Sequence, residues 1–100
     1  MRSITPNEVH ALDDVVILDV REPHELAQAR IEGTIDIPLG ELVARIDEVP
    51  RDTTVYVLCH VGGRSAQATQ YLETPGFDAV NIDGGIVEWY RAGLPVAVGG

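Results

Sequence analysis

The stretch Thr54-Val55-Tyr56-Val57-Leu58-Cys59-His60-Val61-Gly62-Gly63-Arg64-Ser65 decides the fold. It opens with an apolar run of strand length, which passes directly into a glycine-rich segment, and residues that suit a helix follow. Cys59, the only cysteine of the chain, stands where the strand ends. In open α/β sheets, ligands bind at the carboxyl ends of the strands. The stretch therefore predicts a buried strand that brings a thiol to a binding loop.

The position of Cys59 favours a reactive thiol. A helix that starts near Arg64 or Ser65 would direct unpaired N–H groups and the positive end of its dipole towards the sulfur. Such surroundings favour a thiolate and lower a cysteine pKa from about 8.5 to roughly 3.5–7.5. The alternative is a small core residue, which is the usual role of a free cysteine. We favour the nucleophile, because a packing cysteine would lie within the strand.

The loop after Cys59 predicts an anion site above the sulfur. Gly62 and Gly63 tolerate the positive φ angles that let successive N–H groups converge on one point. Such a site suits the transfer of a small electron-rich group onto sulfur and off again. We expect this group to be bound by five residues: His60, Val61, Gly62, Gly63 and Arg64. Arg64 would hold an anionic donor or, alternatively, pair with a nearby carboxylate.

Around this loop, apolar runs alternate with helical patterns, which predicts βαβ units and a mainly parallel sheet. Strands are expected at residues 15–19, 34–37, 54–58 and 79–82. Helices are expected from the capping box at Thr5, from Glu22, from Pro38 to Pro50, from Arg64 or Ser65, and after Gly84-Gly85. The Pro38–Pro50 helix is predicted by apolar residues at helical spacing: Leu39, Leu42, Val43, Ile46 and Val49.

Other side chains have structural roles in this prediction. Ser65 is expected to act as an N-cap, Trp89 to pack in the core, and Asp19 to pair with Arg21 at the end of their strand. Gly84-Gly85 predicts a turn that lets the backbone pass close to the Cys59 loop. One cysteine and scattered histidines make no zinc site, so no metal is expected.

The composition indicates one globular domain over residues 1–100, with 45% hydrophobic and 23% charged residues. A formal net charge of −9, with arginine as the only basic residue besides histidine, makes nucleic acid and anionic membranes poor partners. No apolar run approaches the roughly 20 residues that cross a bilayer. A single cysteine suits a reducing compartment. We therefore expect a cytoplasmic protein, and we expect it to be a monomer.

Four blocks occur along the chain in a familiar order: Leu18-Asp19-Val20-Arg21-Glu22, Arg30-Ile31-Glu32-Gly33-Thr34-Ile35-Asp36-Ile37-Pro38, the loop from Cys59 to Ser65, and Gly84-Gly85 with Trp89, Gly93 and Pro95. Together they resemble the single-domain rhodanese (thiosulfate sulfurtransferase-like) family over nearly the whole chain. The resemblance implies a three-layer α/β sandwich. In it, a mainly parallel five-stranded sheet would be flanked by helices on both faces.

The resemblance also implies a chemistry. The Cys59 thiolate would take the outer sulfur of thiosulfate or of a persulfide donor. The resulting persulfide, held by the amides of the loop, would pass that sulfur to cyanide, a thiol or a protein acceptor. No metal or organic cofactor is required. With Arg64 as its one permanent loop cation and a net charge of −9, we expect the chain to use a persulfide or a protein partner in preference to thiosulfate.

Two other functions are weighed against sulfur transfer. Cysteine phosphatases place five residues between their cysteine and arginine, whereas four separate Cys59 from Arg64, so a phosphatase or a related arsenate reductase is disfavoured. A non-catalytic interaction or regulatory module would keep the fold and use the loop surface to bind a partner. The retained Cys59 favours the enzyme.

Overall fold

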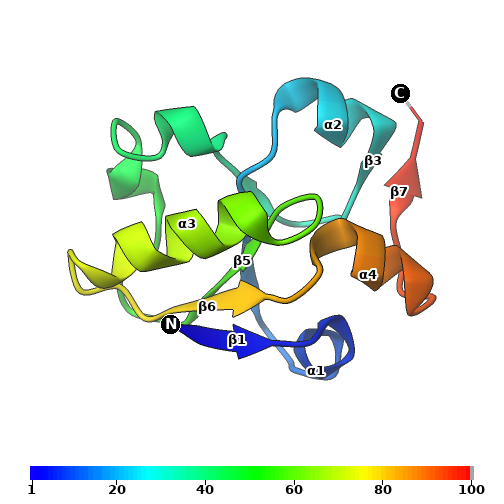
Figure 1. Ribbon diagram of the computed structural model, residues 1–100, viewed down its shortest axis with the longest axis horizontal. Coiled ribbons are helices and arrows are strands. Elements are labelled where there is room, and N and C mark those ends of the chain that lie inside the picture. The colour runs from blue at the N-terminus through cyan, green and yellow to red at the C-terminus, as the bar shows by residue number, and fades with distance from the viewer. Residues whose placement is uncertain (100) are drawn as a thin grey trace.

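The apolar run at the centre of the chain forms β5 (Val55–Leu58), the middle strand of a five-stranded sheet in a computed structural model that describes residues 1–99. Its neighbours, β2 (Val16–Asp19) and β6 (Ala79–Ile82), pair with it in parallel. The edges are β1 (Arg2–Ile4) and β4 (Ile35–Asp36), also parallel, which gives the order β1-β6-β5-β2-β4 (Figure 1). The predicted fold class is confirmed.

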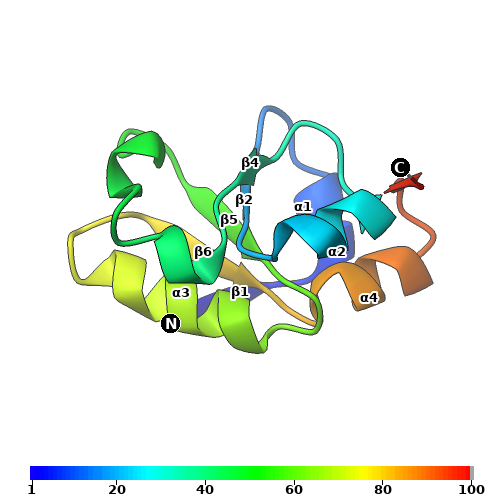
Figure 2. The same cartoon turned by 90° about the horizontal axis from the view of Figure 1, so that it is seen from above.

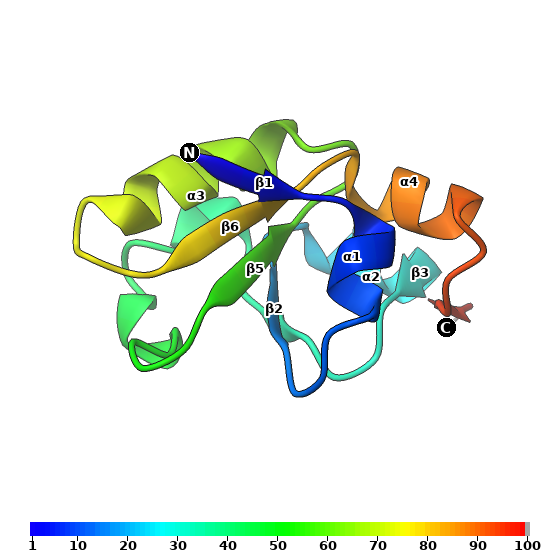
Figure 3. The same ribbon diagram turned by 90° about the horizontal axis from the view of Figure 1, so that it is seen from below.

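Helices cover both faces of this sheet because side chains of both faces are apolar. Leu18 and Val57 belong to a core with α3 (Gly63–Glu73), which runs along one face (Figure 1). Ile17 and Leu58, one residue along in each strand, belong to a second core with α1 (Pro6–His10) and α4 (Gly85–Arg91) on the other face (Figure 3). This alternation is the period of two of a β-strand, here with both sides buried.

The prediction of an α-helix between Pro38 and Pro50 is wrong. The segment contains two single 3-10 turns, η1 (Leu39–Glu41) and η2 (Ile46–Glu48), and η1 lies next to α3 (Figure 2). Neither turn has a side-chain cap, and a glycine and three β-branched residues lower the helix propensity of the segment. Leu42 and Val49 are buried nonetheless. Val43, in contrast, is exposed. The apolar spacing therefore indicated burial for only part of the segment, and it was a misleading sign of an α-helix.

Other predicted boundaries need smaller corrections. The helix α3 begins at Gly63 with Gly62 as its N-cap, so Ser65 is its third residue and does not cap it. Three strands were not expected: β1, and the antiparallel pair β3 (Ala29–Arg30) and β7 (Ala97–Val98). Strands of two or three residues are too short to show a period.

Two local predictions, for Thr5 and for Trp89, are confirmed. Thr5 forms the capping box of α1, in which its hydroxyl accepts the N–H of Glu8 at 3.3 Å. Trp89 is buried and its Nε1–H donates to the carbonyl oxygen of Pro95 at 2.9 Å. Within residues 1–99, no helix combines the length and the apolar character needed to cross a membrane.

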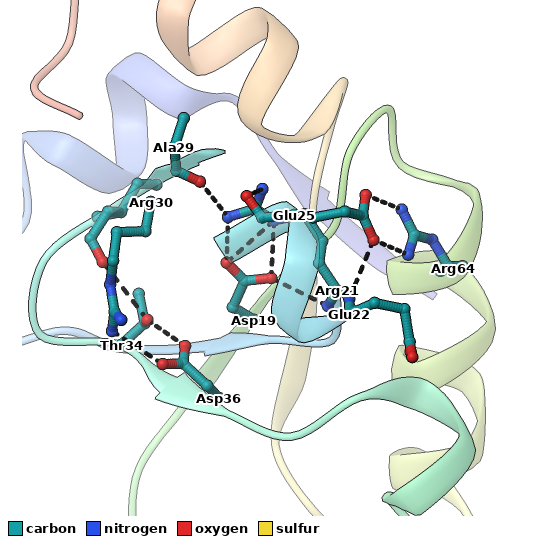
Figure 4. A network of polar contacts seen from close by, with 10 residues as sticks. Asp19, Arg21, Glu22, Glu25, Ala29, Arg30, Thr34, Asp36 and Arg64 are labelled. Carbon is teal, nitrogen blue, oxygen red and sulfur yellow. Dashed lines mark hydrogen bonds and ion pairs between the residues drawn. The ribbon is translucent and has the colours of Figure 1, made fainter. Parts of the chain in front are cut away.

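The expected ion pair of Asp19 and Arg21 lies at the carboxyl end of β2 and is fully buried (Figure 4). Arg21 donates to both carboxylate oxygens from Nε, at 3.0 and 3.2 Å, and through its other nitrogens to the carbonyl oxygens of Glu25 and Ala29. These two acceptors lie in α2 (Pro23–Gln28) and at the start of β3. The pair therefore holds α2 against the end of the sheet.

We predict that Arg21→Met destabilises the protein by roughly 3–5 kcal/mol, because it leaves the Asp19 carboxylate buried without a counter-charge. Chemical denaturation of both proteins near neutral pH measures the difference. Arg45→Met is the control: Arg45 pairs with Glu41 and Glu48 on the surface, and its loss is expected to change stability little. Equal effects of the two substitutions would contradict the prediction.

Candidate functional site

Cys59 follows β5 directly and lies at the floor of the glycine-rich loop. Its side chain belongs to the core under α3, and the residue is 1% exposed. The N–H of Gly62 donates to Sγ at 3.0 Å. The sulfur is therefore almost completely shielded from solvent and held by the loop.

The first turn of α4 holds the loop from one side. The N–H of Ile86 donates to the carbonyl oxygen of Cys59 at 2.9 Å, and the N–H of Val87 donates to that of His60 at 3.2 Å. In a trans peptide unit the C=O and N–H bonds point in opposite directions, and residues 1–99 contain no cis peptide bond. The N–H groups of His60 and Val61 therefore point away from α4.

Four backbone N–H groups of the loop are unpaired. Within residues 1–99, no hydrogen-bond acceptor lies on the N–H groups of His60, Val61, Gly63 and Arg64. Gly62 supplies the left-handed conformation, with φ of +112°, that turns the chain from the loop into α3. The five residues predicted to bind a small group thus form one continuous segment beside Cys59, with four free donors and a fifth already on Sγ.

The predicted close approach of Gly84-Gly85 to this loop is confirmed. Gly85 has φ of +60°, and a Cβ at this position would overlap the carbonyl oxygens of Cys59 and His60. The two N–H bonds from Ile86 and Val87 require this approach. Glycine is therefore needed at residue 85 for two reasons, its backbone conformation and the space that it leaves.

Arg64 points to a carboxylate of α2 (Figure 4). Its two terminal nitrogens donate to the two carboxylate oxygens of Glu25, at 2.6 and 2.8 Å. These hydrogen bonds lower the pKa of Glu25 from 4.5 to about 2. They also raise the pKa of Arg64, with a smaller contribution from the charge of Cys59. Of the two roles considered for Arg64, the structure shows the pairing with a carboxylate.

Ser65 and Asn81 complete the surroundings of the sulfur. The Ser65 hydroxyl lies 3.3 Å from Sγ of Cys59 and 2.6 Å from Oδ1 of Asn81. Sequence reasoning assigned neither contact. For Asn81 a signal was present, since it is the one polar residue of the buried strand Ala79–Ile82. Glu25 gave no such signal, because only the folded chain brings α2 to Arg64.

A hollow opens beside the loop, lined by Arg21, His24, Glu25, Gln28, Ala29, His60 and Ile86. His24 and His60 are both exposed there. Within residues 1–99, no group of three or more histidine, cysteine or acidic side chains is arranged to hold a metal ion. The reactive groups of the loop are the thiol of Cys59, the backbone N–H groups, and Arg64, whose charge is neutralised by Glu25.

Comparison with known proteins identifies relatives of this arrangement. Residues 5–92 match the model of the rhodanese-like domain family. A sulfurtransferase of Allochromatium vinosum is 40% identical over 85 residues, which cover 84% of this chain and 79% of that protein. A rhodanese-related protein of Thermoplasma volcanium, known from its crystal structure, is 37% identical with a TM-score of 0.93, over 97% of this chain and 98% of that one.

A third relative is much longer. The structure of an NAD-dependent persulfide reductase from A. fulgidus is 38% identical with a TM-score of 0.76. The match covers 89% of this chain but 16% of that protein. This chain thus resembles one part of a larger enzyme.

We predict that Gly85→Ala displaces the loop and lowers the rate at which Cys59 reacts with iodoacetamide by at least about tenfold. The reason is that the N–H groups of the loop stabilise a charged sulfur only while the backbone holds them in place. Alkylation followed by mass spectrometry measures the rate. Gly33→Ala is the matched control, since Gly33 also has a positive φ, of +82°, but open space around its Cβ position. Equal rates for the two variants would argue against a role for the close approach.

We predict that Glu25→Gln lowers the free energy of unfolding by about 1 kcal/mol near neutral pH. The pKa of Glu25 is depressed in the folded state, so its ion pair contributes fully above the unfolded value of 4.5 and is lost as the pH falls towards about 2. The difference from the parent protein should therefore shrink in acid. Urea denaturation at a series of pH values tests this, with the exposed Glu73→Gln on α3 as the control. A difference that does not change with pH would contradict it.

Proposed function

Because this chain belongs to the rhodanese-like domain family, we propose that it is a sulfurtransferase that carries sulfane sulfur as a persulfide on Cys59. One observation carries the proposal. The N–H of Gly62 donates to Sγ at 3.0 Å, and the four other N–H groups of the loop have no acceptor within residues 1–99. An amide that donates to sulfur stabilises a negative charge there, and the unpaired amides of the loop are available to a group bound beside it.

The reaction has two displacements and no net change of oxidation state. The Cys59 thiolate attacks the outer sulfur of the donor, the new Sγ–S bond forms, and the bond inside the donor breaks with its electron pair on the leaving group. That group is sulfite from thiosulfate, or a thiolate from a persulfide. An acceptor thiolate or cyanide then attacks the outer sulfur, and the electron pair of the Sγ–S bond returns to Cys59.

The loop amides have a separate task in each half of this cycle. Before loading, the negative charge is on Sγ, which Gly62 contacts. After loading, it is on the outer sulfur, which extends about 2 Å further into the loop. The N–H groups of His60, Val61, Gly63 and Arg64 are the donors that this sulfur would meet.

Charge around the site favours a persulfide donor over thiosulfate. Thiosulfate is a dianion, and it would need a free cation near the loop. Arg64 already gives both terminal nitrogens to Glu25, and the formal net charge of the chain is −9. A low-molecular-weight or protein persulfide brings less negative charge to the same atom.

The hollow beside the loop is the place where we expect the donor and acceptor to bind. It adjoins His60, so a thiol held there would be next to the outer sulfur. Cyanide, which needs no binding surface, would serve as a test acceptor. We place the reaction in the cytoplasm, where a thiol stays reduced, and we propose that the protein acts as a monomer.

The alternative, a non-catalytic interaction module, has one observation in its favour. Val61, at the tip of the loop, is 62% exposed and apolar, as expected of a residue that contacts a partner. A protein acceptor would use the same contact. The exposure of Val61 therefore favours the interaction module over the enzyme only if Cys59 does not accept sulfur.

The deciding experiment is the intact mass of the reduced protein after incubation with glutathione persulfide and, separately, with thiosulfate. We expect a gain of one sulfur atom, reached at least about tenfold faster with the persulfide, reversed by cyanide and absent in Cys59→Ser. A folded parent protein that gains no sulfur from either donor would overturn the sulfurtransferase assignment. Faster loading by thiosulfate would overturn the choice of donor.

A further inference from the structure

Asn81 is a polar residue in a place where an apolar one would serve the fold. It lies in β6, a strand buried at all four positions, and is 5% exposed. A buried amide is costly unless it is hydrogen-bonded. Within residues 1–99 its side chain has one such partner, the hydroxyl of Ser65 at 2.6 Å. Ser65 is itself fully buried, and its other side-chain neighbour is the sulfur of Cys59.

The hydrogen count at Ser65 shows what these contacts can do. A hydroxyl has one hydrogen to donate and can accept as well. When Cys59 is a thiol, its S–H donates to the Ser65 oxygen, and the Ser65 hydrogen goes to Oδ1 of Asn81 or to the carbonyl oxygen of Gly62, 3.1 Å away. When the Ser65 hydrogen goes to Asn81, the S–H of Cys59, the hydroxyl of Ser65 and Oδ1 of Asn81 each have a partner.

When Cys59 is a thiolate, the same contacts must run in the opposite direction. The sulfur now only accepts, so the Ser65 hydrogen can turn to it across the 3.3 Å contact. The Ser65 oxygen is then free to accept, and a half-turn of the Asn81 amide presents Nδ2 where Oδ1 was. The two ends of an amide have nearly the same shape. In residues 1–99, no second hydrogen bond fixes which end faces Ser65.

We propose that Asn81 and Ser65 form a hydrogen-bond relay that reverses with the charge of Cys59 and stabilises its sulfur as an anion. Both are positioning residues, since only Ser65 touches the sulfur and neither touches the group transferred. The inference rests on Cys59 being the nucleophile of the proposed function. It adds a second donor to Sγ, in addition to the N–H of Gly62.

The relay acts in both displacements. In the first, the attacking atom is the thiolate that it stabilises. In the second, the Sγ–S bond breaks with its electron pair on Sγ, and the relay supports the leaving thiolate. While the persulfide exists, Sγ is uncharged and the Ser65 hydrogen returns to Asn81. Reversal of two hydrogen bonds needs no movement of the backbone.

The test is the pH profile of Cys59 alkylation by iodoacetamide in Ser65→Ala and Asn81→Leu. Ser65→Ala removes the hydroxyl that donates to the charged sulfur, so we expect its profile to move about one unit to higher pH, with rates about tenfold lower on the acid side. Asn81→Leu keeps that hydroxyl and removes only the partner that supports it, so we expect its profile to move in the same direction by a smaller amount. Thr69→Val is the matched control. It removes a buried hydroxyl one turn further along α3, where that hydroxyl donates to the backbone of Ser65 at 2.7 Å, and its profile should overlay that of the parent.

Other charged groups near the sulfur stay constant in these variants, namely Arg64 with its partner Glu25, and the adjacent His60. Thermal unfolding shows which variants fold, and Asn81→Ala replaces Asn81→Leu if the latter does not. An unshifted profile in a folded Ser65 or Asn81 variant would overturn the relay.

The intact-mass assay separates this result from the sulfurtransferase assignment. If the parent protein takes up sulfur but the profiles overlay, the relay is wrong and the assignment stands. If the profiles shift but no sulfur is taken up, the relay stands as a device for a reactive cysteine, and the assignment is wrong.

Discussion

The contact between the start of α4 and the Cys59 loop is the constraint on which the site depends. The N–H groups of Ile86 and Val87 donate to the carbonyl oxygens of Cys59 and His60. The N–H groups of His60 and Val61 belong to the same two peptide units, so they point to the other side of the loop. The absence of a side chain at Gly85 allows the approach. The donors that would stabilise a charged sulfur are therefore fixed by backbone packing before any substrate arrives, and no reorganisation is needed at the moment of reaction.

A second constraint comes from the charges of α2. The buried pair of Asp19 and Arg21 holds this helix at the end of the sheet, and the helix in turn brings Glu25 to Arg64 (Figure 4). The result is a cradle of amide dipoles with its one arginine already neutralised. Dipoles favour a charge that is localised on one atom at short range, whereas a free arginine would also attract distant anions. The fold thus selects by fit at one sulfur atom more than by long-range attraction.

Sequence reasoning succeeded where local chemistry decides the structure. The apolar run before Cys59 forms the predicted strand, Gly62 has the predicted positive φ, and Gly84-Gly85 makes the predicted close approach. Gly63 does not have the positive φ expected of it and instead begins α3. It failed at residues 38–50, where the apolar spacing reported burial on the sheet and could not distinguish 3-10 turns from an α-helix. Glu25, Ser65 and Asn81 were missed as site residues because their partners lie 39, 6 and 16 residues away, and only the tertiary fold brings these together.

The two sets of donors around Cys59 must be balanced for sulfur to move in both directions. Gly62 and, in our proposal, Ser65 favour the charge on Sγ, which is the unloaded state. In the proposed cycle, the remaining loop amides would favour the charge on the outer sulfur, which is the loaded state. Stronger donors at Sγ would make Cys59 a better leaving group but a weaker nucleophile, because nucleophilicity falls with thiol pKa. A sulfur carrier works best when its unloaded and loaded states have similar free energies. A donor that reverses with the charge, as the hydroxyl of Ser65 can, supports the thiolate without opposing the persulfide.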